Sequence, residues 1–259
     1  ESSISLEKYD TLKSVIFDIR LPRIIAAVLI GSSLAISGAA FQAMFVNPLV
    51  SPGILGVLSG ASFGAALGMV MGWSWFFINL STFIFGLIAV LFALLISFIY
   101  SSAKNMIILV LGGIISSSLF SALLSIVKYA ADPYDALPAI TYWLMGSLAF
   151  STPNVVWNLS IPLVLGMLIL IFLSKYLNAL SLGDEEAKAL GVDTKKIKII
   201  VILTATFLSA LSVILAGIIG WIGLIIPHIA RLLFGACTKV IIPISALLGA
   251  IFLLIVDNT

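Results

Sequence analysis

The chain has 259 residues, of which 62% are hydrophobic and only 9% are charged, and its mean hydropathy is +1.27. Soluble domains are about 25% charged, so this composition excludes a soluble fold as well as a disordered chain. The single cysteine excludes a disulfide scaffold, and a net charge of +2 with no basic tract before Lys195 argues against nucleic-acid binding. The composition indicates a polytopic membrane protein.

The first 23 residues are mixed and charged, and they lack the basic start and apolar core of a signal peptide. We therefore expect residues 1–23 to form an extramembrane loop, with or without a short helix at the membrane surface. The rest of the chain, within a single domain over residues 1–259, is expected to enter the membrane.

Eight apolar stretches follow the N-terminal segment, and a membrane-crossing helix needs about 20 residues. Most stretches are long enough to span, whereas 222–234 is short. Barrel strands alternate apolar and polar residues, but these runs are continuously apolar, so an all-α helix bundle is predicted. The stretches are 24–45, 52–71, 73–100, 106–129, 154–174, 197–219, 222–234 and 240–256.

Lysines set the expected orientation, because short cytoplasmic loops are rich in positive charge. The segment 175–198 holds five lysines and should be cytoplasmic. Counting spans from that segment places Arg20 and Arg23 on the outer face, against the usual bias. It also places the C-terminus outside. Both outer ends suggest that a first and a last span are missing from this sequence.

Glycines recur along the stretch 52–71 with a spacing of four, which puts them on nearly one face of a helix. Small faces allow helix backbones to approach closely in a membrane. We interpret this stripe as a packing surface buried among other helices. Its members are Gly56, Gly60, Gly64 and Gly68.

The segment 182–192 is the only strongly hydrophilic piece inside the chain, and Gly183 and Gly191 bracket it. Acidic residues in its first turn oppose the positive end of the helix dipole, and Lys188 lies four residues after Asp184. A short cytoplasmic helix is predicted, which on spacing alone is equally a solvated loop helix or a docking helix for a cytoplasmic partner. The acidic residues are Asp184, Glu185 and Glu186.

Chemistry-bearing residues are scarce. Ion-coupled carriers need charged groups inside the membrane, and the apolar stretches carry none at mid-span. There is no phosphate-binding loop and no catalytic set, and one histidine (His228) with one cysteine (Cys237) cannot form a zinc site. We expect no enzyme activity, metal or cofactor on this chain, so energy for transport must come from another chain.

Three groups of motifs resemble the FecCD-type permease subunits of iron–siderophore, haem and vitamin B12 ABC importers, and together they cover essentially the whole chain. The third group is the most specific, although Trp221 stands where phenylalanine is usual. The motifs are LPR at 21–23, SGAAFQ at 37–42, NPL at 47–49 and PGILG at 52–56; LGDEEAKALGV at 182–192; and GWIGLIIPHIAR at 220–231.

The resemblance implies a type II importer permease with an inverted-repeat helix bundle of ten spans, of which about eight are present here. It implies a homodimer in the inner membrane of a bacterium or archaeon, ATP and magnesium on separate ATP-binding subunits, and a periplasmic or lipid-anchored substrate-binding protein. The rival interpretations are an ion-coupled secondary transporter and a membrane scaffold without transport. The residues do not distinguish iron–siderophore, haem, cobalamin or oxyanion cargo.

The resemblance also implies roles for particular residues. The helix 183–191 resembles the coupling helix that fits a groove on the ATPase subunit, with the acidic residues supplying charge and Leu182, Ala187 and Leu190 supplying apolar contact. Arg20 and Arg23 resemble outer-face arginines that meet acidic residues of the binding protein; the alternative is that they only contact lipid headgroups. The inner gate is expected at Ser101, Ser102 and Asn105.

Overall fold

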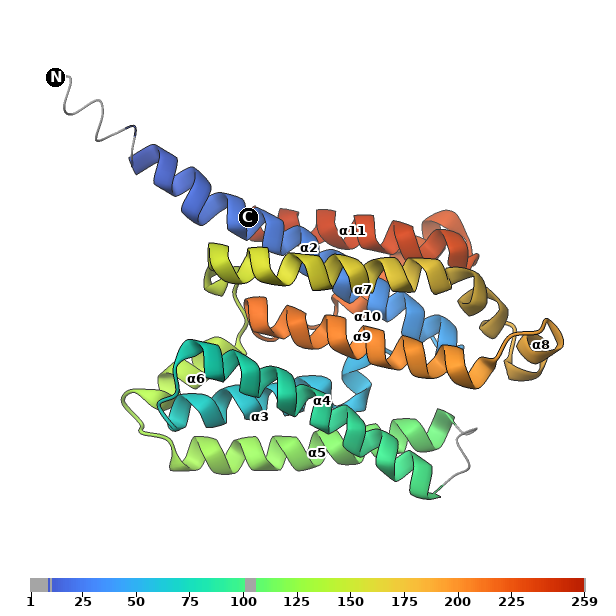
Figure 1. Ribbon diagram of the computed structural model, residues 1–259, viewed down its shortest axis with the longest axis horizontal. Coiled ribbons are helices and arrows are strands. Elements are labelled where there is room, and N and C mark those ends of the chain that lie inside the picture. Colours follow the sequence, from blue (N-terminus) through green and yellow to red (C-terminus); the bar gives the residue numbers. More distant parts are fainter. Residues whose placement is uncertain (1–8, 10, 101–105, 259) are drawn as a thin grey trace.

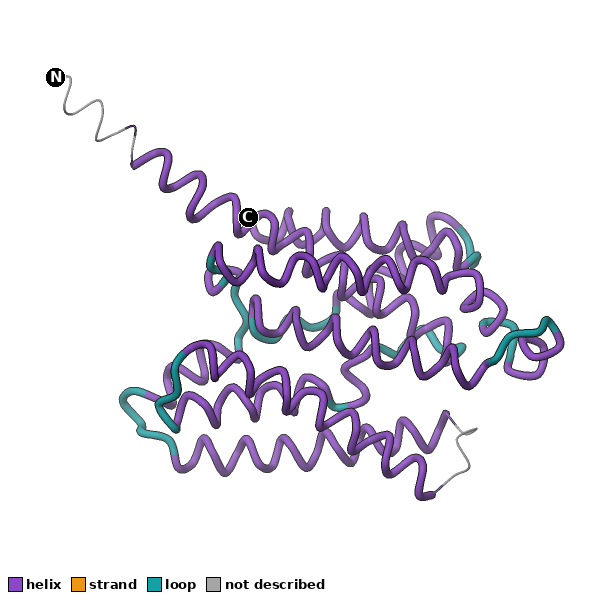
Figure 2. Tube along the Cα trace, viewed as in Figure 1, coloured by secondary structure: helices purple, strands orange, loops and turns teal. Residues whose placement is uncertain are grey.

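The structure is a computed structural model that describes residues 9, 11–100 and 106–258. These residues form helices and connecting turns without a β-strand, which confirms the predicted all-α fold (Figures 1 and 2). In chain order the elements are η1 (Val15–Arg20), α2 (Leu21–Phe45), η2 (Pro52–Leu55), α3 (Val57–Val70), α4 (Trp75–Tyr100), α5 (Met106–Ala130), α6 (Ala136–Leu144), η3 (Leu148–Phe150), α7 (Pro153–Leu180), α8 (Asp184–Ala189), α9 (Thr194–Ala216), α10 (Ile222–Phe234) and α11 (Thr238–Asn258).

Six helices in the described part of the chain are long and apolar enough to cross a membrane, and α3 and α10 are shorter apolar helices. The predicted stretches correspond to these eight elements. Helix α7 continues beyond the expected stretch 154–174, to Leu180. The short helix α6 lies between α5 and α7, outside all of the predicted stretches.

The N-terminal segment was expected to be a loop, with or without a short surface helix, and it instead continues α2 toward the N-terminus. A continuous helix runs from Thr11 to Phe45, and Figure 1 shows its first turns projecting beyond the bundle. The π-helical turn η1 ends beside Pro22, which is buried at the start of α2. Proline lacks an N–H and its ring crowds the preceding turn, so a local widening of the helix allows it to be accommodated without ending the helix.

The two ends of the bundle carry different groups. Helix α8 lies at one end, where α7 ends and α9 begins, while the C-terminal end of α11 and the projecting N-terminal helix lie at the other (Figure 1). Arg20 and Arg23 therefore lie far from the lysine-rich segment 175–198. This is the separation that the span count from the lysines predicts.

The helices α2 and α3 are repeated in order by α9 and α10, but the second pair runs in the opposite direction. Helix α2 is long and mostly buried, and is followed by a break and the 14-residue α3; α9 is likewise mostly buried, and is followed by a break and the 13-residue α10. Both short helices start after a residue in the left-handed conformation, Gly56 (φ 89°) and Trp221 (φ 70°). Since α2 and α9 run in opposite directions (Figure 1), the arrangement is that of an inverted repeat.

Helix α2 packs against α11, α9, α7 and α10, most extensively against α11. Two glycines allow this. A Cβ built on Gly31 would lie 2.7 Å from the Gly249 carbonyl carbon of α11, and one on Gly38 would lie 2.6 Å from the Gly223 Cα of α10. On the α9 side, the hydroxyls of Ser33 and Ser212 are hydrogen-bonded at 2.8 Å in the buried core.

The glycine stripe on α3 faces α4. A Cβ on Gly60 would lie 2.6 Å from the Ala89 Cβ, and one on Gly64 would lie 2.8 Å from the Ser81 carbonyl carbon. Gly68 also faces α4, with its nearest neighbour in Ile78. Gly56 differs, because it precedes α3 in a left-handed turn and approaches α5 instead.

Replacing Gly64 with alanine tests this close approach. The added methyl group would overlap the α4 backbone, and overpacking of this kind costs about 1–3 kcal/mol of unfolding free energy. Gly86→Ala is the matched control, because its Cβ would meet no atom closer than 3.4 Å in the same interface. We expect thermal unfolding of the purified protein to shift downward for Gly64→Ala and little for Gly86→Ala. Equal melting temperatures for the two variants would contradict the packing role of Gly64.

Candidate functional site

Helix α8 is a six-residue helix between the long helices α7 and α9. It begins after Gly183, whose φ of 123° places it in a conformation that glycine favours, and it ends in a Schellman motif at Gly191 (φ 79°). The Val192 N–H donates to the Ala187 carbonyl and the Gly191 N–H to the Lys188 carbonyl, which closes the last turn. The bracketing glycines therefore fix both ends of the helix.

Two ion pairs hold α8, and neither is the predicted pair of Asp184 with Lys188. Lys188 instead pairs with Glu185 at 2.7 Å, and Asp184 accepts a hydrogen bond from Lys198 of α9. The hydrogen bond to Glu185 raises the pKa of Lys188. The bond to Lys198 fastens α8 to the start of the next membrane helix.

The outward surface of α8 is acidic and flanked by apolar residues. Leu182 and Leu190 are 63% and 65% exposed, and the Glu185 and Glu186 side chains are also exposed. Ala187, expected to contact the ATPase subunit, is instead completely buried inside the chain. It faces inward because α8 packs back on α7 and α9, so this residue anchors the helix and leaves the two leucines as its exposed apolar contacts.

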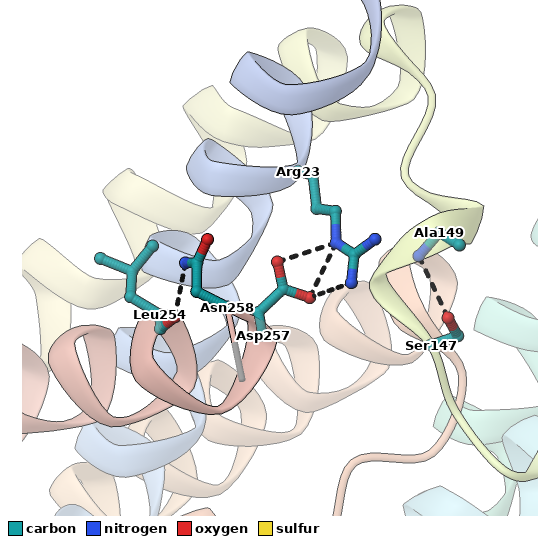
Figure 3. A network of polar contacts seen from close by, with 6 residues as sticks. All are labelled: Arg23, Ser147, Ala149, Leu254, Asp257 and Asn258. Carbon is teal, nitrogen blue, oxygen red and sulfur yellow. Dashed lines mark hydrogen bonds and ion pairs between the residues drawn. The ribbon is translucent and has the colours of Figure 1, made fainter. Parts of the chain in front are cut away.

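At the opposite end of the bundle, Arg23 has a partner within the chain. Its guanidinium forms hydrogen bonds of 2.8 Å from Nε and an ion pair of 2.7 Å from one terminal nitrogen to the carboxylate of Asp257 (Figure 3). The Asp257 side chain is 9% exposed and the Arg23 side chain 42%. This charge-assisted pair joins the start of α2 to the end of α11. Arg20 is exposed on η1.

A hollow of about 530 Å³ lies beside this ion pair. It is lined by Arg23 and Asp257 together with the turn before η3 and the turn after α9. The residues on either side of η3 are hydrogen-bonded to the last residues of α9, because the Ser147 N–H donates to the Ala216 carbonyl at 2.8 Å and the Ser151 hydroxyl donates to the Leu215 carbonyl at 2.9 Å. The segment around η3 is thus fastened to the end of α9.

The motifs at 37–42 and 220–231 meet in the interior. Pro227 has no N–H, so the Gly223 carbonyl one turn earlier lacks its usual helical donor. The Gln42 amide donates to that carbonyl at 3.2 Å and to the Leu224 carbonyl at 3.4 Å. The glutamine therefore satisfies a backbone group that would otherwise be costly inside a membrane.

Among the described residues, no three histidine, cysteine or acidic side chains gather into a group that could hold a metal ion. His228 and Cys237 are both exposed. The expected gate residues Ser101, Ser102 and Asn105 lie outside the described residues.

Sequence reasoning did not single out Asp257, although the signal was present. It is the only acidic residue after Asp193 and directly follows the predicted apolar stretch 240–256, and an ionisable residue at the edge of a membrane segment calls for a partner. Gly31 and Gly249 were missed for a different reason. Gly249 is the single glycine of α11, and the two glycines of α2, Gly31 and Gly38, are seven residues apart, so neither helix shows the repeated spacing of four that marks the stripe on α3.

Comparison with known proteins gives one consistent result. The profile of the FecCD transport family matches residues 2–259. The molybdate import system permease protein MolB of Haemophilus influenzae is 42% identical over 254 residues, which are 98% of this chain and 75% of that protein. The hemin transport system permease protein HmuU of Yersinia pestis is 36% identical over 266 residues, covering 96% and 75%.

A solved structure is similar as well. It is described as an inward-facing conformation of a metal-chelate type ABC transporter, and it is 42% identical in sequence with a TM-score of 0.89. The match covers 96% of this chain and 79% of that one. The likeness therefore extends to the arrangement of nearly all the helices.

The Arg23–Asp257 ion pair is testable by a double-mutant cycle with Arg23→Gln, Asp257→Asn and both together. Each single change leaves a charged partner unpaired, so each should lower the unfolding free energy by about 1–3 kcal/mol. The double variant should lose less than the sum, with a coupling of at least about 0.5 kcal/mol in thermal or chemical unfolding. Asn258→Ala is the control, since the Asn258 side chain donates to the Leu254 carbonyl within its own helix. Additive losses would show that the pair contributes nothing.

Proposed function

Because the chain belongs to the FecCD transport family, we propose that it is the permease subunit that carries a metal chelate or metal oxyanion into the cytoplasm, using ATP hydrolysed by a separate subunit. The protein is a multi-pass membrane protein of the ABC importer permease class. We also propose a class of cargo, a role for α8 as the coupling helix and a contact with the substrate-binding protein. A second copy of this chain would form the other half of the importer.

The observation that carries the proposal is the form of α8 within a bundle of this family. A short acidic helix with two exposed leucines lies at the lysine-rich end of the bundle, held by an ion pair to α9 (Figure 1). A solvated loop helix has no need of exposed leucines on both flanks or of fixed ends. Such a rigid, amphipathic surface is suited to a groove on a partner protein.

The cargo class follows from the names of the relatives and from the chemistry of the spans. The relatives import molybdate, hemin and cobalamin, and the matching structure is of metal-chelate type. In this chain the buried polar side chains of the two most buried helices, α2 and α9, are hydroxyls and one amide, namely Ser32, Ser33, Ser37, Gln42, Thr194, Thr206, Ser209 and Ser212. Neutral groups suit passage of a bulky complex or an oxyanion better than coordination of single ions.

Reversing the charge of α8 tests the coupling step. In the variant Glu185→Lys with Glu186→Lys, lysines would face the surface that accepts acidic side chains, and like charges at an interface cost several kcal/mol. We expect binding of the ATP-binding subunit to weaken by at least about tenfold, with ATP-driven uptake into proteoliposomes falling accordingly.

The matched control makes the same change of charge at the other end of the bundle, in Asp18→Lys with Asp135→Lys, since both residues are exposed there. It should retain the ATP-binding subunit. Normal assembly and uptake in the α8 variant would contradict the coupling role. Uptake that continues without ATP, and stops when the proton gradient is collapsed, would instead overturn the importer proposal and favour a secondary transporter.

We propose different roles for Arg20 and Arg23 in docking of the substrate-binding protein. Arg23 is committed to Asp257, whereas Arg20 is exposed one helical turn earlier at the edge of the bundle. Arg20 is therefore the residue we propose for contact with a carboxylate of the substrate-binding protein. Arg23 would contribute mainly by holding α2 in place.

Arg20→Glu should slow association of the substrate-binding protein roughly fivefold, which is the effect of losing an exposed ion pair worth about 1 kcal/mol. The difference should shrink as salt is added, because salt screens exposed charges. Lys128→Glu, which makes the same change of charge at the outer end of α5, is the control. Surface plasmon resonance at low and high salt measures the association rates of the two variants. An association rate of Arg20→Glu that equals that of the unchanged protein at every salt concentration would rule out the contact.

A further inference from the structure

A cleft of about 380 Å³ opens between α4, α5 and the first turns of α9. Ser97 and two lysines, Lys195 and Lys198, are its polar lining residues. The remaining walls are apolar and are formed by Leu94, Phe98, Met106, Leu109, Ile199 and Ile202. The proposed importer function makes no use of this cleft.

The lining residues of α9 share one helix face. Lys195, Lys198, Ile199 and Ile202 follow the spacing i, i+3, i+4 and i+7. The lysines lie in the first turns of α9, which begins at Thr194, and the isoleucines continue deeper into the bundle. The cleft therefore changes along its length from cationic to apolar, as a phospholipid changes from headgroup to acyl chain.

The charges around the cleft leave one lysine available. Lys198 is 12% exposed and paired with Asp184. Asp193 accepts a hydrogen bond from the Lys196 N–H at the start of α9. Lys195 is exposed, and among the described residues no carboxylate lies within ion-pair distance of its ammonium group.

We infer that this cleft binds an anionic phospholipid of the inner leaflet, with the headgroup phosphate at Lys195 and an acyl chain against Ile199 and Ile202. Basic pockets between membrane helices on the cytoplasmic side attract anionic headgroups. The second positive charge, on Lys198, lies beside the phosphate position but is offset by Asp184. Lys195 is accordingly the residue that selects an anionic over a zwitterionic lipid.

A lipid fits the cleft better than a protein partner. The three helices that form it are all candidate membrane spans, so its apolar part lies at the depth of the hydrocarbon. Exposed apolar side chains continue on the same helices at Leu91, Leu95 and Leu203. A soluble partner cannot reach that surface, whereas a lipid of the inner leaflet can.

The test compares phosphatidylglycerol with phosphatidylcholine of the same acyl chains, added to the purified permease and detected by native mass spectrometry and by thermal shift. We expect phosphatidylglycerol to bind and to raise the melting temperature more than phosphatidylcholine. Lys195→Gln should weaken phosphatidylglycerol binding about fivefold, the usual contribution of one lysine near an anionic membrane surface. Lys195→Arg, which keeps the positive charge, should bind phosphatidylglycerol like the unchanged protein.

Lys196→Gln is the matched control, because Lys196 is the exposed neighbour on α9 that does not line the cleft. It should bind phosphatidylglycerol like the unchanged protein. Equal binding of the two lipids, or equal loss in the Lys195 and Lys196 variants, would overturn the inference. Protection by soluble glycerophosphoglycerol as strong as that by the lipid would also overturn it, since this would indicate a simple anion site without an acyl chain.

Discussion

Close backbone contact along α2 is the interaction on which the rest of the bundle depends. Lipid tails are as apolar as leucine side chains, so burial of apolar surface gives membrane helices little reason to associate, and dispersion between closely packed backbones must supply it. Gly31 against Gly249 and Gly38 against Gly223 bring α11 and α10 onto the same helix. Helices α7 and α9 complete the layer around α2, and the second layer of α3, α4 and α5 joins through α9.

Polar side chains in this interior donate hydrogen bonds to backbone carbonyls of neighbouring helices. Proline in α10 frees a carbonyl, and Gln42 from α2 supplies the donor for it. Serine hydroxyls do similar work elsewhere, such as Ser116, which donates to the Ala89 carbonyl at 2.6 Å, and Ser81, which donates to the Gly64 carbonyl at 2.8 Å. These bonds cross between helices, so they fix the register of the pairs that glycine packing brings together.

Local pattern predicted those features whose causes are local. Apolar length located the helices, the spacing of four marked Gly60 and Gly64 as a packing face, and Gly183 with Gly191 marked the ends of α8. Features that depend on distant partners were not predictable: Arg23 and Asp257 are 234 positions apart, and Ala187 faces inward only because of tertiary packing. The charged residues before Leu21 suggested a loop. The helix nevertheless continues from Thr11 into α2, because Pro22 is the only strong helix breaker in this segment and the helix accommodates it.

Both ends of helix α9 are held by polar contacts with neighbouring segments, so the helix can transmit a displacement along its axis. Its 23 residues extend about 35 Å at 1.5 Å per residue. At the α8 end Lys198 is paired with Asp184, and at the opposite end the last carbonyls of α9 accept hydrogen bonds from Ser147 and Ser151. A helix resists compression along its axis, so a force that displaces α8 along the membrane normal reaches the outer loop with little loss unless one of these ties breaks. The two surfaces of the protein are therefore mechanically joined through one side of the bundle.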